Sequence, residues 1–525
     1  MSPVYDVAVV GAGPVGLFLA CELGLAGCSV VVLEREPERG SPWKAVPLGM
    51  RGLSAVSVAA FDRRGMLHAL LSASGAGDAP GAGSGTDFGR DFDADFDKDE
   101  PSPPRSAGHF AGIMLDPADV DVTALPFRLP GPASEGLMTS LAAVETVLSE
   151  RAAELGVEIR RGVPVSAVTQ HDDSVVAHAG EHAYRARWLV GCDGGRSTVR
   201  GLTGFDFVGS EPQFTGYVML ATVADPEKLR PGFNLTPTGM YLTMPATGYI
   251  GMLDCDGGAF DRSQRPTRAH LQTVLRRVSG TDVTLSDVRL VSTFTDRAMQ
   301  TTTYRQGRVL LAGDAAHIHS PLGAQGLNLG IGDAMNLGWK LAATVRGHAP
   351  GGLLDTYTRE RRPIGAAALD WTRAQSAAMK PDAHGQAVQQ VIRDLIGTRD
   401  GTTYVFTRAS GSSNWYDLGS EHPLVGRDAP DLRLEDGTRL ADLMRDGRGV
   451  VLELGADRSL QGPAKRRKSR IRYVAGPARN DLGLRAVLVR PDGTVAWATA
   501  GDPDHAQFEQ TVDRWFGAAD RGEHT

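Results

Sequence analysis

A glycine-rich turn between an apolar strand and a helix constrains the fold of this chain more than any other feature. Residues 4–10 form an apolar run with a single charge, Asp6, which predicts a buried parallel strand. A turn with the spacing GxGxxG follows, then a helix-like segment and a second apolar strand at 29–33. Strand, helix and strand in this order predict an α/β domain whose parallel sheet is covered by helices.

The same turn predicts a nucleotide-binding site. Gly11, Gly13, Pro14 and Gly16 permit a tight turn and a close approach of the backbone to a pyrophosphate, and the helix that follows supplies oriented N–H groups. Glu34 ends the second strand, where its carboxylate can accept both ribose hydroxyls and disfavours a 2′-phosphate. A glycine turn without a ligand is the alternative. The position between strand and helix, with an acid ending the next strand, favours the adenosine of FAD or NAD.

Two later turns repeat the pattern of a strand followed by small residues. A predicted strand at 188–190 leads into Asp193 and Gly194, and a second strand leads into Gly313 and Asp314. Asp314 stands where a carboxylate can bind a ribityl hydroxyl, and the glycine-rich residues after it would offer N–H groups to an electron-rich ring edge. Each turn alone could be an ordinary βα turn. The interpretation depends on all three occurring in this order.

Composition sets the class of protein. A chain of 525 residues is too long for one compact core, so two or three domains are expected. Hydrophobic residues make up 42% and charged residues 22%, as in globular proteins. The net charge of −7 gives no reason to expect nucleic acid or an anionic membrane as a partner. The basic run at 465–470 is interpreted as a solvated loop.

The four cysteines are scattered and form no CxxC pair, so neither a metal site nor a disulfide framework is expected. No stretch of ~20 consecutive apolar residues is present, which predicts no membrane span. A cytoplasmic protein is therefore expected.

Changes in composition and periodicity divide the chain into four parts. A Gly-, Ser-, Asp- and Pro-rich stretch predicts a disordered insertion, and more frequent alternation predicts an antiparallel sheet that could form one wall of a substrate pocket. The predicted parts are an FAD-binding domain at 1–72, 109–204 and 301–380 with the insertion at 73–108, the substrate-binding sheet domain at 205–300, a helical linker at 381–422, and a small α/β domain at 423–525. In the sheet domain Met240, Leu242 and Met244 would form an apolar face towards the substrate, with core packing as the alternative.

Together, the three turns resemble the signature of the class A flavoprotein monooxygenases, which have the para-hydroxybenzoate-hydroxylase fold. The similarity extends over 353–363 and over the tail at 488–497, which resembles the aromatic polyketide hydroxylases of angucycline, anthracycline and tetracycline pathways. The resemblance implies an α/β fold class with a Rossmann-type FAD-binding domain, an antiparallel-sheet substrate domain and a C-terminal thioredoxin-like α/β domain. No cysteine lies beyond Cys255, so this last domain lacks redox cysteines.

The resemblance also implies roles for individual residues. Glu34 and Arg35 would hold the adenosine end of FAD, Arg51 would approach the pyrophosphate, and Asp193 would contact both FAD and NAD(P)H. The other implied cofactor residues are Lys44, Gly194, Gly313, Asp314 at the ribityl chain, and Pro321, Gly323, Gly326, Leu327 and Asn328 along the isoalloxazine. The chain departs from the family pattern at Lys44, where relatives usually have arginine, and at Ala324, where glycine is frequent.

The implied activity is an FAD-dependent monooxygenation. NADPH or NADH would dock transiently and reduce the flavin, O₂ would add at C4a, and the hydroperoxide would hydroxylate a phenol or quinone of a polycyclic aromatic polyketide. Pro321 and Gly323 would lie near the reacting flavin atoms. His317 or His319 could take a substrate proton, with hydrogen bonding within the loop as the alternative. The expected partners are the aromatic substrate and O₂, and the protein would be a monomer or a homodimer.

Other functions remain compatible with these motifs. Baeyer–Villiger insertion or an oxidative ring rearrangement would use the same substrate class. A flavin reductase or dehydrogenase is a non-oxygenase alternative, which the C-terminal tail disfavours. A flavin-binding regulatory protein without turnover is disfavoured by the intact segment 321–328, and a halogenase by the absence of a WxWxIP segment.

Overall fold

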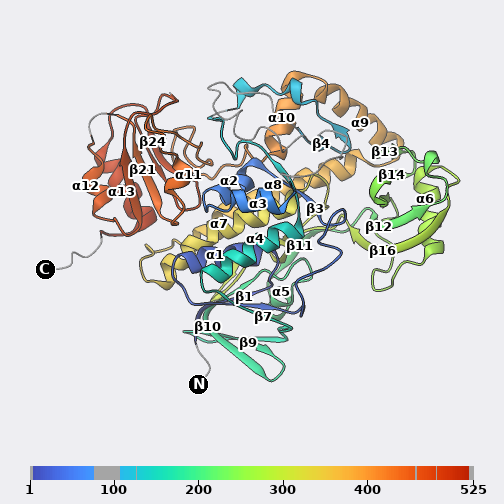
Figure 1. Ribbon diagram of the computed structural model, residues 1–525, viewed down its shortest axis with the longest axis horizontal. Helices are drawn as coiled ribbons and strands as arrows, with labels where there is room; N and C mark the ends of the chain where they lie inside the picture. The colour runs from blue at the N-terminus through green and yellow to red at the C-terminus, as the bar shows by residue number, and fades with distance from the viewer. Residues whose placement is uncertain (1–3, 76–106, 126, 456–457, 481, 520–525) are drawn as a thin grey trace.

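The computed structural model describes residues 4–75, 107–125, 127–455, 458–480 and 482–519. Three sheet-containing parts surround two long helices, α7 (Gln325–Val345) and α8 (Thr356–Ala378) (Figure 1). In this view the parallel sheet lies below α7, the antiparallel sheet lies at the right and the C-terminal domain at the left. Most of the predicted insertion, residues 76–106, lies outside the described residues.

The sheet of the first part is mainly parallel. Its order is β18-β19-β10-β1-β2-β7, and the hairpin β8–β9 extends it through β10. The strands β19, β10, β1, β2 and β7 run parallel where they pair. The strands are β1 (Tyr5–Val10), β2 (Val30–Glu34), β7 (Glu158–Arg161), β8 (Ala167–Gln170), β9 (Val175–Ala179), β10 (His182–Gly191), β18 (Arg305–Gln306) and β19 (Val309–Leu311).

The first strand is a continuous apolar run because its residues are buried whichever face they occupy. Val7, Ala8 and Val9 are all fully buried. The helix α1 (Pro14–Leu25) lies against α7 and α4 (Leu141–Glu154). The predicted strand–turn–helix–strand unit is therefore present, and it forms the middle of the sheet.

Short elements surround this core. They are α2 (Ala55–Asp62), α3 (Leu67–Ala73), α5 (Thr198–Thr203), the pair β3 (Met50–Leu53) and β6 (Leu137–Ser140), and the three-stranded sheet of β11 (Phe207–Ser210), β17 (Ala298–Thr301) and β20 (His317–Ile318).

The second part is an antiparallel sheet with the order β13-β14-β15-β12-β16. The helix α6 (Arg268–Ser279) packs on one face, where Leu271 and Val278 contact a core that includes Tyr241. Successive strand residues point to opposite faces, so Met240 and Leu242 lie on the face away from α6. The strands are β12 (Thr215–Val223), β13 (Gly232–Thr236), β14 (Gly239–Met244), β15 (Tyr249–Asp254) and β16 (Leu285–Thr295).

The segment predicted as a helical linker forms α9 (Ala383–Ile396) and α10 (Arg399–Ala409). These helices pack against each other, α9 contacts α8, and α10 contacts the hairpin of β4 (His109–Phe110) and β5 (Ile113–Met114). Ile396 and Val405 share one buried cluster with Phe110, Leu322 and Met240. The two helices thus close an apolar core that also includes the antiparallel sheet.

The C-terminal domain has a mixed four-stranded sheet with the order β22-β21-β23-β24, in which only the β21–β22 pair is parallel. Within the predicted basic loop, Arg467 is buried and its Nε donates to the Gly517 carbonyl, so the prediction of a solvated loop is wrong there. The elements are α11 (Leu440–Leu443), β21 (Gly449–Glu453), α12 (Gln461–Lys465), β22 (Ile471–Ala475), β23 (Ala486–Val489), β24 (Val495–Thr499) and α13 (His505–Phe516).

Buried charges join this domain to the central helices. Arg490 donates to both oxygens of Glu360 at 3.0 and 2.8 Å, and Lys340 Nζ donates to Glu360 Oε2 at 2.8 Å. Asp492 accepts from Arg490 at 2.5 Å. All four side chains are almost fully buried.

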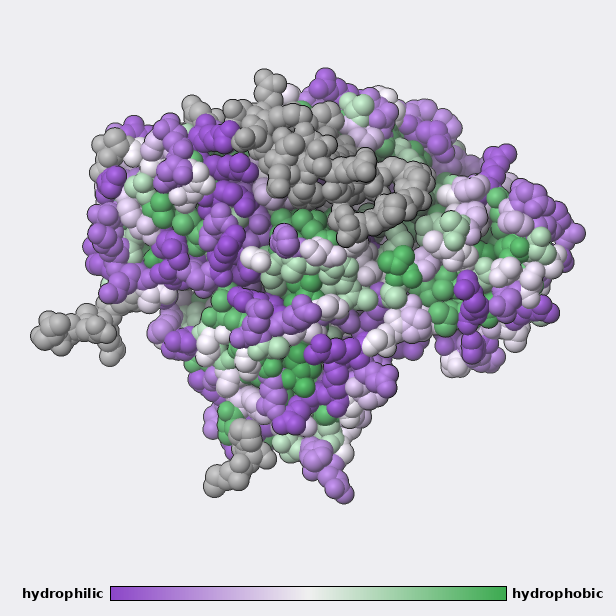
Figure 2. All heavy atoms as spheres, in the orientation of Figure 1, coloured by the Kyte–Doolittle hydropathy of each residue, from purple (hydrophilic) through white to green (hydrophobic). Residues whose placement is uncertain are grey.

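On the outer surface, hydrophilic residues predominate over the C-terminal domain, as the purple atoms at the left of Figure 2 show.

Candidate functional site

The three predicted turns meet at one edge of the parallel sheet. They follow β1, β10 and β19, and these strands are neighbours that end in the same direction. Backbone bonds continue past the strand ends, from Gly11 N to Leu33 O at 2.8 Å and from Cys192 N to Val10 O at 2.8 Å. The carboxyl edge of such a sheet is where α/β proteins bind ligands. The structure therefore brings the motifs together as a single site.

The glycine turn after β1 is shaped to admit a ligand. Gly11 has φ +105°, and a Cβ there would lie 2.5 Å from the Cys192 carbonyl oxygen. A Cβ on Gly16 would lie 2.0 Å from the Gly11 oxygen. A Cβ on Gly13 would meet nothing within 4 Å, so the side facing the helix N terminus is open. Pro14 begins α1, and no side chain caps its first N–H groups. These groups can receive a pyrophosphate.

The carboxylate of Glu34 is held beside this turn. Its Oε2 accepts from Ala12 N at 2.6 Å, and its Oε1 accepts from Glu36 N at 2.9 Å. Arg35 instead extends outward, with 69% of its side chain exposed, and pairs with Glu36. Glu34 thus has the position expected of a ribose ligand, whereas the structure does not bring Arg35 into the site.

Lys44 is fixed by a partner on α4. Its Nζ lies 2.8 Å from Glu145 Oε2. Burial raises the pKa of Glu145 and the bond to Lys44 opposes this change. The ammonium of Lys44 is therefore paired with a carboxylate of α4.

Asp193 shapes the turn after β10. Its Oδ1 accepts from Ser197 Oγ at 2.5 Å and its Oδ2 accepts from Val199 N at 3.0 Å, which caps α5. Gly194 has φ +78°, and a Cβ there would meet nothing within 4 Å. Both carboxylate oxygens are thus engaged within the turn, and the open space lies at Gly194.

Asp314 is exposed just after β19, within a single 3-10 turn (Gly313–Ala315). Burial lowers the pKa of Arg51, and the nearby Tyr249 and Asp314 oppose this change. Arg51 comes from β3 and Tyr249 from the antiparallel sheet, so these side chains border the same space from two domains. Sequence reasoning missed Tyr249, although its place at the start of an alternating strand was a signal that it could face the pocket.

The loop that leads into α7 completes this edge. Gly323 has φ +79° and Ala324 has φ +54°, so the chain turns sharply before the helix begins. A Cβ on Gly326 would lie 3.5 Å from Asp314 Oδ1, which places the first turn of α7 beside this carboxylate. Asn328 accepts from Ser54 N at 2.8 Å. The first helical N–H groups lack a side-chain cap and can face an electron-rich ligand edge.

The neighbouring loop residues differ in exposure. Pro321 is exposed at the surface of the loop, Leu322 is buried, and Leu327 packs on the main core. The loop therefore presents Pro321 outward while its apolar side chains anchor it.

The two loop histidines have different surroundings. His317 is 1% exposed, and its Nε2 lies 2.7 Å from Asp333 Oδ2. A side chain so enclosed has no direct path to a substrate proton, so its position favours the structural alternative. His319 donates from Nδ1 to the Ser320 carbonyl at 2.7 Å, and burial lowers its pKa, which favours the neutral form.

An apolar sheet face approaches the loop from the second domain. Met240, Leu242 and Met244 lie on one face of β14, and Leu242 pairs with Gly251 while Met244 pairs with Tyr249. Met240 shares a buried cluster with Leu322. The three residues thus lie together as expected, and Met240 also contributes to core packing.

Comparisons with known proteins agree with this geometry. A family model described as FAD binding domain matches residues 4–372, and one described as aromatic-ring hydroxylase, C-terminal, matches 422–519. The chain belongs to the class A flavoprotein monooxygenases. It is an FAD-dependent monooxygenase, and the predicted fold class is confirmed.

Individual flavoprotein monooxygenases match over nearly their whole length. A monooxygenase of Claviceps purpurea (strain 20.1) is 43% identical and covers 98% of this chain and 97% of its own. The anhydrotetracycline monooxygenase of Streptomyces rimosus is 38% identical and covers 98% of this chain and 99% of its own. The solved anhydrotetracycline hydroxylase of Streptomyces rimosus superposes with a TM-score of 0.83 at 36% identity, over 99% of this chain and all of that one.

The residues of this flavoprotein monooxygenase fit FAD on structural grounds. The open space at Gly13 and Gly194 would admit a pyrophosphate, and Glu34 stands at the ribose position. The exposed carboxylate of Asp314 and the uncapped start of α7 offer an acceptor and donors for the ribityl chain and ring.

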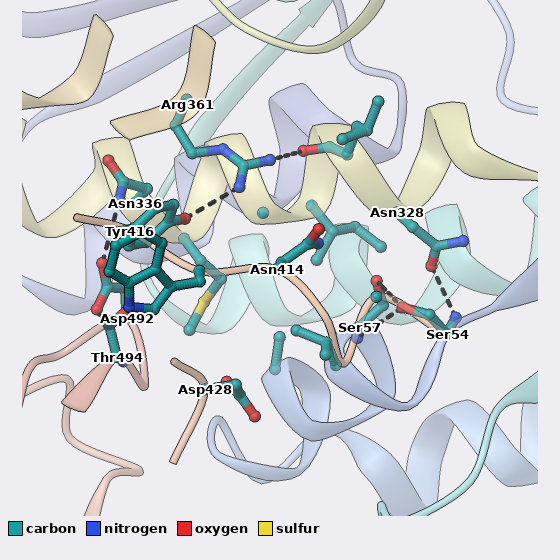
Figure 3. Close-up of a pocket in the computed structure, with 18 of the residues that line it drawn as sticks. Ser54, Ser57, Asn328, Asn336, Arg361, Asn414, Tyr416, Asp428, Asp492 and Thr494 are labelled. Carbon is teal, nitrogen blue, oxygen red and sulfur yellow. Dashed lines mark hydrogen bonds between the residues drawn. The ribbon is translucent and has the colours of Figure 1, made fainter. Parts of the chain in front are cut away.

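A separate cavity of about 80 Å³ lies between α2, α7 and the segment that enters the C-terminal domain (Figure 3). Asn328 and Ser54 lie at one end of it, and Tyr416 and Asp492 lie at the other. Arg361 extends above it and reaches the Tyr416 hydroxyl at 3.0 Å. Neither Glu34 nor Asp314 lines this cavity, but Gln325 and Asn328 of the first turn of α7 do, so the cavity adjoins the cofactor edge at that end.

Within the described ranges, no group of three or more His, Cys, Asp or Glu side chains could hold a metal ion. Across the same ranges, none of the helices combines the length and the apolar character needed to cross a bilayer.

Proposed function

We propose that this flavoprotein monooxygenase hydroxylates a phenol or quinone ring of a polycyclic aromatic polyketide, with NADPH or NADH as reductant. The observation that carries the proposal is the apolar face of β14 and β15 lying against the loop at Leu322, beside the exposed Asp314. A relative named anhydrotetracycline monooxygenase supports the substrate class. When bound, FAD supplies the redox chemistry, taking a hydride from the nicotinamide and transferring one atom of O₂ to the substrate.

In this proposal the sheet edge holds the cofactor. The N–H groups of Gly13 and of the first turn of α1 after Pro14 bind the pyrophosphate, Glu34 binds the ribose and Asp314 accepts from the ribityl chain. The uncapped first turn of α7 donates to the electron-rich edge of the ring. Arg51 adds positive charge beside Asp314.

The antiparallel sheet domain at 205–300 orients the substrate and excludes water. Leu242 and Met244 are only partly buried and offer an apolar surface to a flat ring system. Tyr249 lies on the same face, and burial raises the pKa of its hydroxyl, so it remains protonated and can donate to a substrate oxygen.

Purified protein, loaded with FAD, tests the proposal. NADPH and NADH oxidation and O₂ consumption are followed with a panel of fused-ring phenols and quinones, and products are examined by mass spectrometry. At least one substrate should stimulate both rates and gain the mass of one oxygen atom. If no panel member changes either rate, the aromatic-substrate proposal is refuted.

A variant of the sheet face sharpens the test. Leu242→Glu should abolish the stimulation by substrate and leave FAD content unchanged, because the new charge would have to be buried against the aromatic ring. Val391→Glu, at a side chain that is 59% exposed on α9, serves as the control and should keep the stimulation.

A further inference from the structure

A single buried carboxylate, Asp333, connects the three segments that form the flavin side of the site. Asp333 lies on α7 and is fully buried. Its Oδ2 accepts from Gly313 N at 3.0 Å and from His317 Nε2 at 2.7 Å. One oxygen atom therefore fixes both ends of the turn that presents Asp314.

The turn needs this acceptor. Gly313 has φ +62°, and a Cβ there would crowd Val15 at 3.1 Å, so only a glycine backbone fits between β19 and α1. Its N–H is buried and bonds to Asp333. A buried N–H without a partner is destabilising, so without the carboxylate the turn would shift towards another acceptor.

The negative charge of Asp333 is balanced by a buried arginine. Arg361 Nε donates to Asp333 Oδ1 at 2.7 Å, and its other nitrogens donate to the Leu329 carbonyl and to the Tyr416 hydroxyl. Burial alone would raise the pKa of Asp333, but Arg361 and His317 hold it below its usual range. The carboxylate therefore stays ionised and keeps all three bonds.

We propose that Asp333 is a positioning residue for the ribityl and ring portion of FAD, acting through the Gly313 N–H and His317 on the exposed carboxylate of Asp314. It does not touch the cofactor. It fixes the spacing between Asp314, the loop at 317–324 and the first turn of α7, which must all face one ligand. This inference rests on the proposed cofactor site and is independent of the proposed substrate.

The test compares FAD with ADP, which carries the adenosine and pyrophosphate of FAD but neither the ribityl chain nor the ring. Affinities of the apo-protein are measured for both ligands, and the visible circular dichroism of bound FAD is recorded. The variants are Asp333→Asn and the double variant Asp333→Asn/Arg361→Gln, which removes both buried charges so that neither is left unpaired.

The control pair is Glu22→Gln/Arg64→Gln. Glu22 and Arg64 form a buried carboxylate–arginine pair in the same part of the protein, with bonds of 2.6 and 2.8 Å, and their bonds do not reach the loop. The double substitution therefore measures how the loss of a buried ion pair affects FAD and ADP binding when the pair does not contact the loop.

We expect Asp333→Asn/Arg361→Gln to bind ADP as the wild type does, to bind FAD roughly tenfold more weakly, and to show an altered circular dichroism spectrum. The control pair should keep the wild-type ratio of FAD to ADP affinity and the wild-type spectrum. An unchanged ratio and spectrum in the Asp333 variants would overturn the inference. So would loss of ADP binding in both of them, because Asp333 would then serve the fold as a whole. A wild-type protein that binds ADP but not FAD would overturn the cofactor site itself, and the inference with it.

Discussion

Asp314 is an acidic side chain exposed at the end of a buried strand, beside the uncapped start of a helix. Arg51 and His319 both interact electrostatically with this carboxylate. A bound hydroxyl would satisfy the carboxylate, and hydrogen bonds to charged groups contribute about 1.5–3 kcal/mol. Its contribution to cofactor binding can therefore be measured with a single substitution.

Asp314→Ala should weaken FAD binding by roughly tenfold to a hundredfold, because that bond is removed. The ratio of flavin to protein absorbance after gel filtration measures retention. Asp370→Ala removes a carboxylate that is 75% exposed on α8 and should retain the cofactor. Retention at wild-type occupancy by Asp314→Ala would refute the assigned role.

Ala324 adopts a backbone conformation that suits glycine. Its φ of +54° and ψ of +33° lie in the left-handed region, which costs a residue with a Cβ about 1–2 kcal/mol. Ala324→Gly should therefore raise the free energy of unfolding, by about 1 kcal/mol after the greater entropy of the unfolded chain is subtracted. Urea denaturation followed by fluorescence gives this value.

The adjacent glycine provides the opposite substitution. Gly323 has φ +79°, and Gly323→Ala should lower the same free energy. If both substitutions change stability in the same direction, backbone strain is not the cause.

Single residues differ in how far sequence predicts them. The tight turn at Gly11 and Gly16 and the place of Glu34 at the end of β2 could be predicted, because they depend on neighbours within a few residues or on one adjacent strand. The bond from Asp193 to the start of α5 could not be predicted, because the sequence does not distinguish an aspartate that caps a helix from one that binds a ligand. Asp333 gave no local signal, because its three partners come from distant parts of the chain.

At the level of elements, glycines on α7 allow this helix to pack closely against α1. A Cβ on Gly338 would lie 2.5 Å from Glu22 Cβ, and one on Gly330 would lie 2.3 Å from a Val15 methyl. The two backbones can approach closely only because these Cβ atoms are missing. The first turn of α7, with its free N–H groups, is thereby fixed relative to the glycine turn that begins α1.

Gly338→Ala should destabilise the protein by about 1–3 kcal/mol, because overpacking outweighs the higher helix propensity of alanine. The change is measured as a shift in the denaturation midpoint. Gly201→Ala on α5 is the matched control, since a Cβ there meets nothing within 4 Å. That variant should be neutral or slightly stabilised, and an equal loss in both variants would contradict the packing argument.

Elements were predictable where the pattern was local. The unit β1–α1–β2 is visible in its apolar runs and glycines, and the antiparallel strands of the second domain are visible in their alternation. The sheet order was not, because β10 and β19 join β1 from positions far along the chain. The helices α9 and α10 were expected as a linker, but their packing depends on a cluster contributed by several distant segments.

For the whole molecule, the buried charges around Glu360 couple the C-terminal domain to the helices that carry the site. Burial alone would raise the pKa of Glu360, but Arg490 and Lys340 lower it below its ordinary value of 4.5. Asn336 also donates to the carboxylate at 2.7 Å. A folded pKa below the unfolded one means that the group stabilises the fold fully above the unfolded value, and that this stabilisation is lost as the pH falls below it.

The free energy of unfolding should therefore fall steadily as the pH is lowered below about 4.5. Urea titrations from about pH 6 to about pH 3.5 measure this dependence. Glu360→Gln should cost about 3–5 kcal/mol at neutral pH, because Lys340 loses its carboxylate partner and Arg490 keeps only Asp492, and should reduce the acid dependence. Trp339 and Trp515 lie within 5.5 and 4.5 Å of the Arg490 guanidinium, so their fluorescence reports the event. An acid dependence in Glu360→Gln as steep as that of the wild type would refute the assignment.

Composition and periodicity predicted a division of the chain into parts, but they gave no indication of the contact between the parts. Lys340, Glu360 and Arg490 look like ordinary charges on helices and strands when the sequence is read alone. Their burial follows only from the docking of two domains that are separated by α9 and α10.

The same buried charges restrict which C-terminal domains of relatives can replace the one in this chain. A chimera that replaces everything after residue 422 keeps Glu360 and Lys340 but receives a foreign residue in place of Arg490. If the donor keeps an aspartate at the position of Asp492 but has no arginine at that of Arg490, the interface between the domains encloses two carboxylates and one ammonium, and one negative charge has no partner. Successful exchanges of this domain should therefore be those in which the donor chain carries an arginine and an aspartate at the positions of Arg490 and Asp492, whatever its overall identity.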